Sequence, residues 1–341
     1  MTSVPDLPGV LSADEVIESA AAIARLQVDT GMIPWFVGGH CDPWNHVETA
    51  MALDVAGFHV EAEQAYEWLV TTQRADGSWW NYYLPDGSVE EAKLDTNVCA
   101  YVATGVWHHW LCTWDRAFVD HLWPTVERAL DWVLGMRKEN GLAIWARTEH
   151  AVPWAYALLT GSASIQHALR CGARLAELIN EPRPDWVEAA DRMARLVANH
   201  PECFEPKERW AMDWYYPVLA GAMTGELAKA HLADKWDVFA MEGKGIRCVS
   251  DEPWITASET AEAAIAFAVT GDLATATDLL AWTRSHRLDD GSYWTGIVYP
   301  SLERFPFGET SAYTAAAVIL AADAITGTSP ASGVFVPRAR D

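Results

Sequence analysis

Residues 259–269 read Glu-Thr-Ala-Glu-Ala-Ala-Ile-Ala-Phe-Ala-Val, a segment that would be apolar around most of its circumference as a helix. A helix that is apolar on all sides is buried on all sides. The opening of this segment, an acid followed by threonine and a small or polar residue, recurs at Glu48, Asp95 and Glu309. Repeats at intervals of this kind mark arrays of one supersecondary unit, so the sequence predicts a series of similar buried helices.

Two further buried segments start near Glu149 and at Asp213, which gives six expected inner helices. Their expected ranges are 47–56, 95–112, 151–160, 213–224, 256–269 and 309–324. Amphipathic segments alternate with them, after a first helix that Ser12 and Glu15 open with a capping box. The later amphipathic segments are expected at 59–74, 117–138, 162–179, 184–199, 226–240 and 272–286.

This alternation predicts an all-α fold, an (α/α)6 toroid with six inner and about six outer helices. We expect one catalytic domain over residues 1–341, with a short flexible C-terminal tail from about 328. The inner helices of such a toroid run parallel, so their N-termini meet around a central funnel. Acids at these positions can act as helix caps, and together they make the funnel anionic.

The composition restricts the classes of ligand. The 341 residues carry a formal net charge of −23, which argues against nucleic acid or an anionic membrane as a partner. Six cysteines without paired spacing indicate free thiols in a reducing compartment. The N-terminal residues lack the pattern of a signal peptide, and no apolar run is long enough to span a bilayer, so we expect a cytoplasmic protein.

The 19 tryptophans indicate a sugar ligand, because many of them lie in the loops that precede the expected inner helices. Aromatic rings are flat plates with an apolar face, which suits the C–H face of a sugar ring. About half of these tryptophans have an alternative explanation as packing between helices. The expected substrate-binding residues are Trp35, Trp44, His46, Glu48, Trp79, Trp80, Asp95, Asp213, Tyr215, Arg247, Trp254, Glu259, Trp294 and Glu309.

Two carboxylates depart from the repeat pattern and are the expected catalytic pair. Glu262 lies one turn inside a buried helix, where an acid is costly unless it is used. We expect either a raised pKa, as a general acid requires, if Glu262 is poorly solvated, or an ionised carboxylate held by a neighbour such as Arg247. Asp42 precedes a rigid Pro-Trp and the repeat acid Glu48. Paired carboxylates facing across a funnel favour an inverting glycoside hydrolase, with the roles of acid and base left open and Glu259 as the nearest rival.

Other chemistries find little support in the sequence. Nucleotide-binding, serine-hydrolase and zincin motifs are absent. His40 and His46 flank Asp42 and are better explained by hydrogen bonding than by metal binding, so we expect no metal and no cofactor. Among the inner-helix acids, Asp95, Asp213 and Glu309 are better explained as ligands for sugar hydroxyls or as helix caps.

The sequence resembles two groups of helical toroids. Asp42-Pro-Trp44 and the Ile144-Trp145 loop resemble the (α/α)6 glycosidases of the glucoamylase and trehalase type, although Ala146 stands where their acid would fall. Gln73-Arg-Ala-Asp-Gly-Ser-Trp79 fits the QxxxGxW motif of terpenoid cyclases and prenyltransferases, echoed at 288–294. That motif is mainly a structural clamp, and the catalytic DxDD and DDxxD motifs of those enzymes are absent.

A more specific resemblance extends over nearly the whole chain. It is carried by DPWNHVETAMAL (42–53), MDWYYPVLAGAMTG (212–225), RCVSDEPWITASET (247–260) and SYWTGIVYP (292–300). These loops resemble an actinobacterial group often labelled prenyltransferase-like, which includes an endo-α-mannosidase of 3-O-methylmannose polysaccharide. The resemblance implies an α-(1→4)-linked, methylated mannose polymer as substrate. The alternatives are a terpenoid cyclase or prenyltransferase-like enzyme and a non-catalytic glycan-binding toroid.

Overall fold

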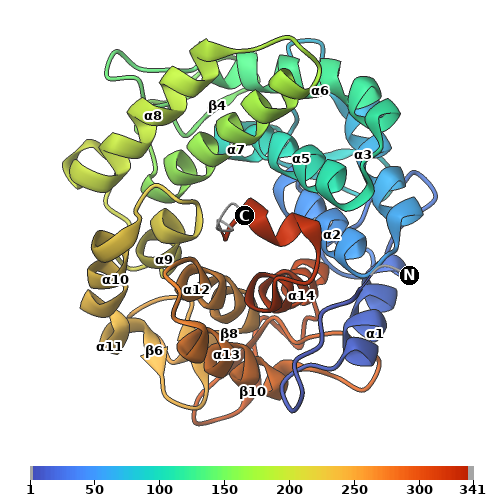
Figure 1. Ribbon diagram of the computed structural model, residues 1–341, viewed down its shortest axis with the longest axis vertical. Helices are drawn as coiled ribbons and strands as arrows, with labels where there is room; N and C mark the ends of the chain where they lie inside the picture. The colour runs from blue at the N-terminus through green and yellow to red at the C-terminus, as the bar shows by residue number, and fades with distance from the viewer. Residues whose placement is uncertain (1–2, 337–341) are drawn as a thin grey trace.

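The computed structural model describes residues 3–336 and consists of two concentric rings of helices (Figure 1). The inner ring is formed, in chain order, by α2 (Pro43–Val55), α4 (Thr96–Ala100) with α5 (Val102–Thr113), α7 (Leu159–Leu178), α9 (Met212–Leu219), α12 (Ala257–Val269) and α14 (Ala312–Thr326). The outer ring is formed by α3 (His59–Thr72), α6 (Arg116–Gly135), α8 (Pro184–Asn199), α10 (Gly225–Asp234), α13 (Leu273–Trp282) and α1 (Ala13–Ala24). The predicted (α/α)6 toroid is confirmed.

The third repeat differs from its prediction. Residues 151–160 were expected to form an inner helix, but they contain β5 (Pro153–Trp154) and a bend, and Glu149 is exposed. Pro153 explains this, because proline disfavours helical backbone at the residue before it. The inner helix of this repeat is α7, so the segment 162–179 that was expected in the outer ring belongs to the inner ring. The expectation was wrong because its serines and glutamine are polar in the sequence but buried in the structure.

The inner helices are joined to the outer helices by connections of very different length at the two ends of the toroid. Short connections join the C-terminal ends of α2 and α12 to the outer helices that follow, residues 56–58 and 270–272. The connections that lead into the N-termini of the inner helices are long. These long connections carry α11 (Trp236–Phe239), the 3-10 helices η1 (Pro201–Cys203) and η2 (Thr283–His286), and ten short strands.

The strands form a belt around the N-terminal end of the inner ring. They are β1 (Tyr82–Tyr83), β2 (Val89–Glu91), β3 (Lys93–Asp95), β4 (Ala146–Thr148), β5, β6 (Ala240–Met241), β7 (Gly245–Arg247), β8 (Trp254–Thr256), β9 (Gly296–Val298) and β10 (Glu303–Arg304). All neighbouring pairs are antiparallel, in the orders β1-β2, β3-β4-β5 and β10-β9-β8-β7-β6. Each strand is only two or three residues long, too short to give the alternating pattern that would reveal it in sequence.

The QxxxGxW motif acts as a clamp between helices, as its structural interpretation predicts. The Gln73 side-chain amide donates to the carbonyls of Gly77 and Thr125, at 3.0 and 2.9 Å, and so ties the end of α3 to its loop and to α6. The Trp79 indole donates to the Leu69 carbonyl at 3.0 Å. Gly77 has φ +95°, and an added Cβ would lie 2.3 Å from the Arg128 carbonyl oxygen, so glycine is required there.

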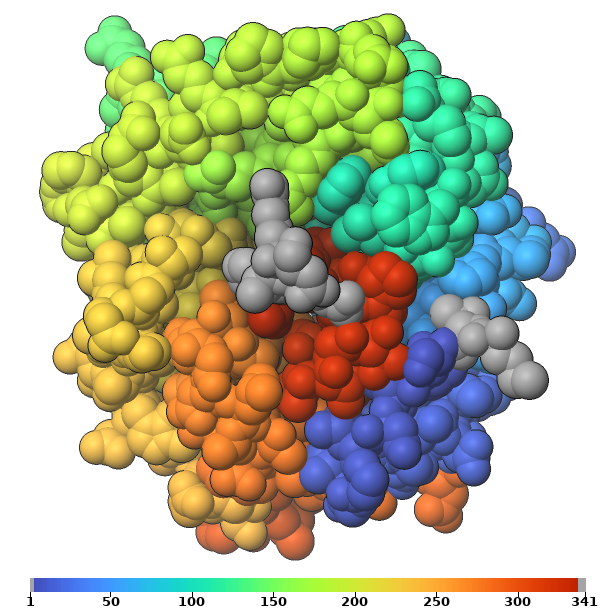
Figure 2. Space-filling model, viewed as in Figure 1, coloured from blue at the N-terminus to red at the C-terminus, as the bar shows by residue number. Residues whose placement is uncertain are grey.

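The C-terminal segment closes the other end of the inner ring. After α14, η3 (Pro330–Val334) packs beside α5, and the His167 ring stacks on Phe335 and hydrogen-bonds the Val334 carbonyl at 2.9 Å. Figures 1 and 2 show these red residues in the middle of this face. The flexible tail expected from about 328 is therefore corrected for residues 329–336, and residues 337–341 lie outside the described part of the chain. No helix among residues 3–336 is long and apolar enough to cross a membrane.

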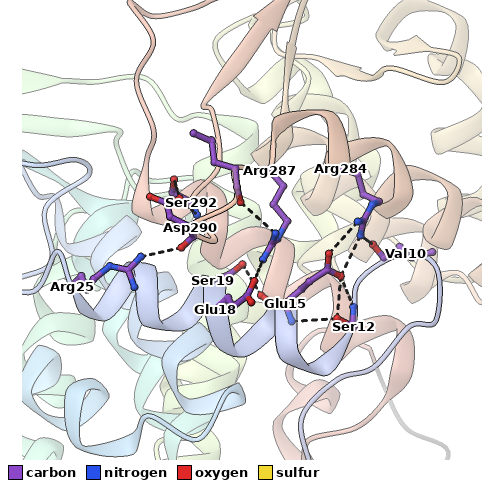
Figure 3. A network of polar contacts seen from close by, with 11 residues as sticks. Val10, Ser12, Glu15, Glu18, Ser19, Arg25, Arg284, Arg287, Asp290 and Ser292 are labelled. Carbon is purple, nitrogen blue, oxygen red and sulfur yellow. Dashed lines mark hydrogen bonds and ion pairs between the residues drawn. The ribbon is translucent and has the colours of Figure 1, made fainter.

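A network of polar contacts joins α1, the first helix, to the connection between α13 and α14 (Figure 3). These contacts tie the last repeat to the beginning of the chain. Glu15, which forms the predicted capping box with Ser12, also accepts from Arg284 at 3.0 Å. Arg284 donates to the Val10 carbonyl at 2.6 Å, and Arg287 donates to Glu18 at 2.6 Å. The hydrogen bonds from Arg284 lower the pKa of Glu15 to about 2.

Replacing Arg284 with alanine is expected to lower the free energy of unfolding by about 1 kcal/mol at neutral pH. Water screens the ion pair with Glu15, so this pair contributes little, and most of the loss comes from the hydrogen bond to the Val10 carbonyl. The folded-state pKa of Glu15 is depressed, so the stabilisation is complete above about pH 4.5 and disappears as the pH falls towards 2. Urea unfolding at pH 7 and pH 3 measures both effects. Lys229→Ala, which removes a local pair with Glu226 on α10, is the control and should cost less.

Candidate active site

A cavity of about 490 Å³ opens at the end of the toroid where the inner helices begin. Side chains from the N-terminal ends of all six inner helices line it, together with residues of the strand belt. This volume is typical of small-ligand sites. Five carboxylates line the cavity, namely Asp42, Asp95, Asp213, Glu259 and Glu262. Of the six helix-start acids expected in the funnel, Asp95, Asp213 and Glu259 line the cavity, together with the two acids that depart from the repeat.

Asp42 is the N-cap of α2 and is surrounded by donors. Its Oδ1 accepts from the backbone amides of Trp44 and Asn45, each at 2.9 Å. Its Oδ2 accepts from the Trp35 indole and the Asn45 side-chain amide, each at 2.7 Å. Burial raises the pKa of Asp42, while these four hydrogen bonds oppose the rise by stabilising the ionised form. Asp42 is thus a buried acid whose hydrogen-bond partners stabilise the ionised carboxylate.

Glu262 has the opposite environment. Its side chain is 8% exposed, and the Tyr215 hydroxyl donates to it in a short hydrogen bond. Burial raises the pKa of Glu262 well above its ordinary value, and the neighbouring acids Glu48 and Glu259 raise it further. Arg247, the expected counter-ion, instead donates to the Val238 carbonyl at 2.8 Å. The surroundings of Glu262 therefore favour its protonated form, whereas the four donors around Asp42 favour a carboxylate.

Asp95 and Asp213 occupy the equivalent helix starts on the other side of the ring. Asp95 caps α4 through the amides of Asn97 and Val98, at 2.9 and 3.3 Å. Burial raises the pKa of Asp95 to about 6, although nearby Lys93 lowers it. Asp213 accepts from the Thr160 hydroxyl at 2.5 Å, and burial raises its pKa. Asp95 caps its helix, whereas Asp213 lies in the first turn of α9, and both carboxylates can accept from a sugar hydroxyl.

Glu259 and Glu309 belong to the last two repeats. Glu259 lines the cavity and accepts from the Ser258 hydroxyl at 2.7 Å and from the Cys248 thiol at 3.2 Å. Glu309 is half-buried, accepts from Thr295 at 2.9 Å, and lies in the loop before α14. Glu259 thus lies within the site, whereas Glu309 is not among the residues that line the cavity.

Aromatic rings form much of the cavity wall. The predicted residues Trp35 and Trp44 are among them, and Trp35 packs edge-on against Tyr313 with ring centres 4.8 Å apart. The remaining aromatic lining residues are Tyr82, Trp145 and Trp210. Flat apolar rings next to carboxylates are the surfaces that a sugar needs. Asn97 adds a buried Oδ1 without a hydrogen-bond partner in the described chain, a free acceptor for a hydroxyl.

Several expected binding residues lie in the packed interior instead. Trp79 is fully buried, as is His46, whose two ring nitrogens bond the Ile33 amide and the Ala65 carbonyl. Tyr215 lies behind Glu262, and Glu48 bonds the Tyr101 hydroxyl at 3.1 Å beneath the cavity. These side chains support the site from behind, because a fully buried side chain has no surface to offer a sugar.

Three other expected tryptophans lie outside the cavity lining, in the strand belt and its loops. Arg74 stacks 3.8 Å above the Trp80 ring. The Trp254 indole donates to the Phe305 carbonyl at 3.3 Å, and Arg304 lies 5.8 Å from the Trp294 ring centre. These contacts fit the packing alternative for about half of the tryptophans.

The site also contains residues that the sequence did not single out. Asn45, Tyr82, Lys93, Asn97, Lys207 and Tyr313 all line the cavity. Asn45 and Asn97 follow the capping acids Asp42 and Asp95 within the first turn of their helices. Their position in the sequence therefore indicated that they would lie near the cavity. Tyr82 and Lys93 come from the β1–β3 region, where only the pairing of short strands brings them to the cavity.

Among residues 3–336, no group of three or more His, Cys, Asp or Glu side chains is placed to hold a metal ion. His40, one of the residues weighed for that role, pairs with Glu90 at 2.8 Å and stacks on Tyr82. The cavity therefore presents acid–base groups and aromatic walls, an arrangement suited to glycoside chemistry.

Comparison with known proteins agrees with this chemistry. No model of a known protein family matches the sequence. The MMP endo-(1,4)-3-O-methyl-alpha-D-mannosidase of Mycolicibacterium hassiacum is 48% identical over 335 residues, which cover 98% of this chain and 92% of that protein. A wild-type glycosidase structure has a TM-score of 0.73 at 14% identity, covering 93% of this chain and 97% of its own. A D-mannose isomerase structure has a TM-score of 0.70 at 12% identity, covering 93% and 97%, so likeness at this level shows the fold alone.

Proposed function

Because this chain belongs to the glycosidase family of the Mycolicibacterium hassiacum endo-mannosidase, we propose that it hydrolyses an α-(1→4)-linked 3-O-methylmannose polysaccharide at internal bonds, with inversion. The observation that carries the proposal is the cavity in which a protonated acid, Glu262, and a hydrogen-bonded carboxylate, Asp42, meet among aromatic walls. The identity of the proposed substrate rests on the relative's name, and the proposed mechanism rests on the residues that line the cavity.

Glu262 is the proposed general acid. A general acid must hold a proton at the working pH and give it to the oxygen of the bond being broken. Burial and the neighbouring acids keep Glu262 protonated, and it lines the cavity. As Glu262 becomes an anion, the Tyr215 hydroxyl that already donates to it stabilises the new charge.

Asp42 is the proposed base that activates water. Its four donors favour the ionised form, and it lies on α2, separated from α12 in the inner ring by α14. A water molecule that gives its proton to Asp42 must compete with one of these donors, and the Asn45 side chain or the Trp35 indole would have to yield. Glu259 and Asp95, which also line the cavity, are the competing assignments.

Inversion follows from this assignment, because a base that uses water must leave room for that water beside the sugar. Inverting pairs lie about 6.5–9.5 Å apart and retaining pairs about 5–5.5 Å apart. Asp42 and Glu262 come from two non-adjacent inner helices, which favours the larger carboxyl separation of the inverting enzymes. A diphosphate substrate, as in the terpenoid alternative, would meet five carboxylates and only two lysines, Lys93 and Lys207, in the lining.

The direct test is to incubate the purified protein with a 3-O-methylmannose polysaccharide and with plain α-(1→4)-manno-oligosaccharides. We expect fragments of intermediate length from the methylated polymer, and proton NMR of the first product should show the β anomer. Release of single sugars only would contradict internal cleavage, and an initial α anomer would contradict inversion. Release of diphosphate from a polyprenyl diphosphate would favour the terpenoid alternative.

Trp210 is expected to contribute to polymer binding, because its ring lines the cavity and is still 43% exposed. Trp210→Ala should raise KM for the polysaccharide about tenfold, equivalent to about 1.4 kcal/mol, with kcat changed little. The matched control is Trp114→Ala, since Trp114 is 62% exposed and ends α5 at the opposite end of the toroid. Equal KM values for Trp210→Ala and wild type would remove Trp210 from the binding surface.

A further inference from the structure

A cluster of two acids and three tyrosines extends from Glu262, which lines the cavity, into the packed interior beneath it. Glu48 on α2 is 6% exposed, and its Oε1 accepts from the Tyr101 hydroxyl at 3.1 Å. Glu262 on α12 accepts from Tyr215, and Tyr216 is buried beside them. Because α2 runs inward from Asp42, Glu48 lies deeper than the cavity-lining residues of that helix.

Neither glutamate forms an ion pair within residues 3–336. The hydrogen bonds that reach them come from tyrosine hydroxyls, which are neutral donors. Two buried carboxyl groups that interact electrostatically without a cation between them are not both ionised near neutral pH. Their titrations are therefore linked, and the first proton lost from the pair makes the second harder to remove.

The titratable groups that face this pair come from every element around it. They are Asp42 at the start of α2, Tyr101 between α4 and α5, Tyr215 and Tyr216 on α9, Glu259 on α12 and Cys248 between β7 and β8. All of them are acids, phenols or a thiol, so none supplies a positive charge. Burial raises the pKa of Glu48 to about 8, with Asp42 adding to the rise, and the repulsion from Glu48 adds to the high pKa of Glu262.

We propose that Glu48 is a positioning residue that acts through Glu262, keeping the catalytic proton on Glu262 without touching the substrate. This inference rests on the proposed role of Glu262 as general acid. It replaces the expectation that Glu48 binds sugar, because the structure puts the Glu48 carboxyl below the cavity and hydrogen-bonded to Tyr101. It also explains why a costly buried acid stands at this position, although Asp42 already caps α2.

The test is the pH dependence of kcat/KM on the polysaccharide for wild type and Glu48→Gln. Activity is lost on the alkaline side when Glu262 loses its proton. Without the charge of Glu48, Glu262 should ionise more easily, so the alkaline limb should move to lower pH by about one unit or more. Below the limb, kcat and KM should stay within about threefold of wild type, because the residues that contact substrate are unchanged.

Two further variants separate this effect from a general disturbance of packing. Glu48→Asp keeps a carboxyl group and should return the alkaline limb at least halfway to the wild-type position. Glu48→Met keeps the volume without the acid and should behave like Glu48→Gln. Identical limbs in wild type, Glu48→Gln and Glu48→Met would overturn the proposal, as would equal shifts in all three variants.

Infrared spectroscopy tests the same point without activity and on the wild-type protein itself. The carbonyl stretch of protonated carboxylic acids should disappear in two linked steps as the pH rises above neutral, and Glu48→Gln and Glu262→Gln should each remove one step. A single step on the wild-type protein would overturn the inference. If Glu262→Gln cleaves the polysaccharide at the wild-type rate, the proposed function of Glu262 fails; if only the Glu48 variants behave as wild type, the inference about Glu48 fails alone.

Discussion

Glu262→Gln is expected to lower kcat on the polysaccharide by about 10³-fold, within the 10²–10⁴ range of general acid catalysis, while KM changes little. Glutamine keeps the size of the side chain and can still accept from the Tyr215 hydroxyl, so the variant should fold. It cannot donate the proton that the departing sugar oxygen needs. Steady-state kinetics at the wild-type pH optimum measure the loss.

The role of Glu262 is identified by varying the leaving group. A nitrophenyl manno-oligosaccharide releases a phenolate that needs little protonation, so Glu262→Gln should cleave it at a rate within about tenfold of wild type. A loss as large as that on the polysaccharide would assign Glu262 to the base instead. Wild-type activity on both substrates would exclude Glu262 from the chemistry.

The toroid could be predicted from sequence because its inner helices carry a repeated signal. Acids such as Glu259 recur where a helix begins, and the segments that follow are apolar on all sides. This signal failed in the third repeat, where α7 contains Ser162, Ser164 and Gln166. Small and polar residues can be buried when they find partners, as Gln166 does with the Ala220 carbonyl at 2.5 Å, and a hydropathy pattern does not contain that information.

The acids of the site could be located from sequence better than its aromatic walls. Asp42 and Glu262 stood out because they depart from the repeat, and both line the cavity. The sequence alone does not show which of the adjacent Trp79 and Trp80 is buried, because the surroundings of a loop tryptophan depend on partners that no local pattern identifies. Trp79 is fixed by Leu69, ten residues before it. Tyr82 reaches the cavity from a strand of two residues that no periodicity reveals.

Asp42→Ser is expected to lower kcat by about 10²–10⁴-fold, and to lower the free energy of unfolding by about 1–3 kcal/mol because the Trp35 indole and the Asn45 side-chain amide lose their acceptor. Serine is as good an N-cap as aspartate, so its hydroxyl can still accept from an amide at the start of α2. It cannot take a proton from water. The smaller side chain also leaves room for azide, which should restore turnover and give a β-mannosyl azide if Asp42 is the base of an inverting enzyme.

Asp115→Ser is the matched control, because Asp115 caps α6 through the amides of Ala117 and Phe118, at 2.8 and 3.1 Å, on the outer ring. Asp115→Ser should melt within a few degrees of wild type, Asp42→Ser should melt at a lower temperature but still cooperatively, and only Asp42→Ser should lose activity. If Asp42→Ser retains wild-type kcat, Asp42 serves only as a cap and a hydrogen-bond partner of Trp35. The base would then be sought with Glu259→Gln and Asp95→Asn, the two cavity carboxylates that compete for the role.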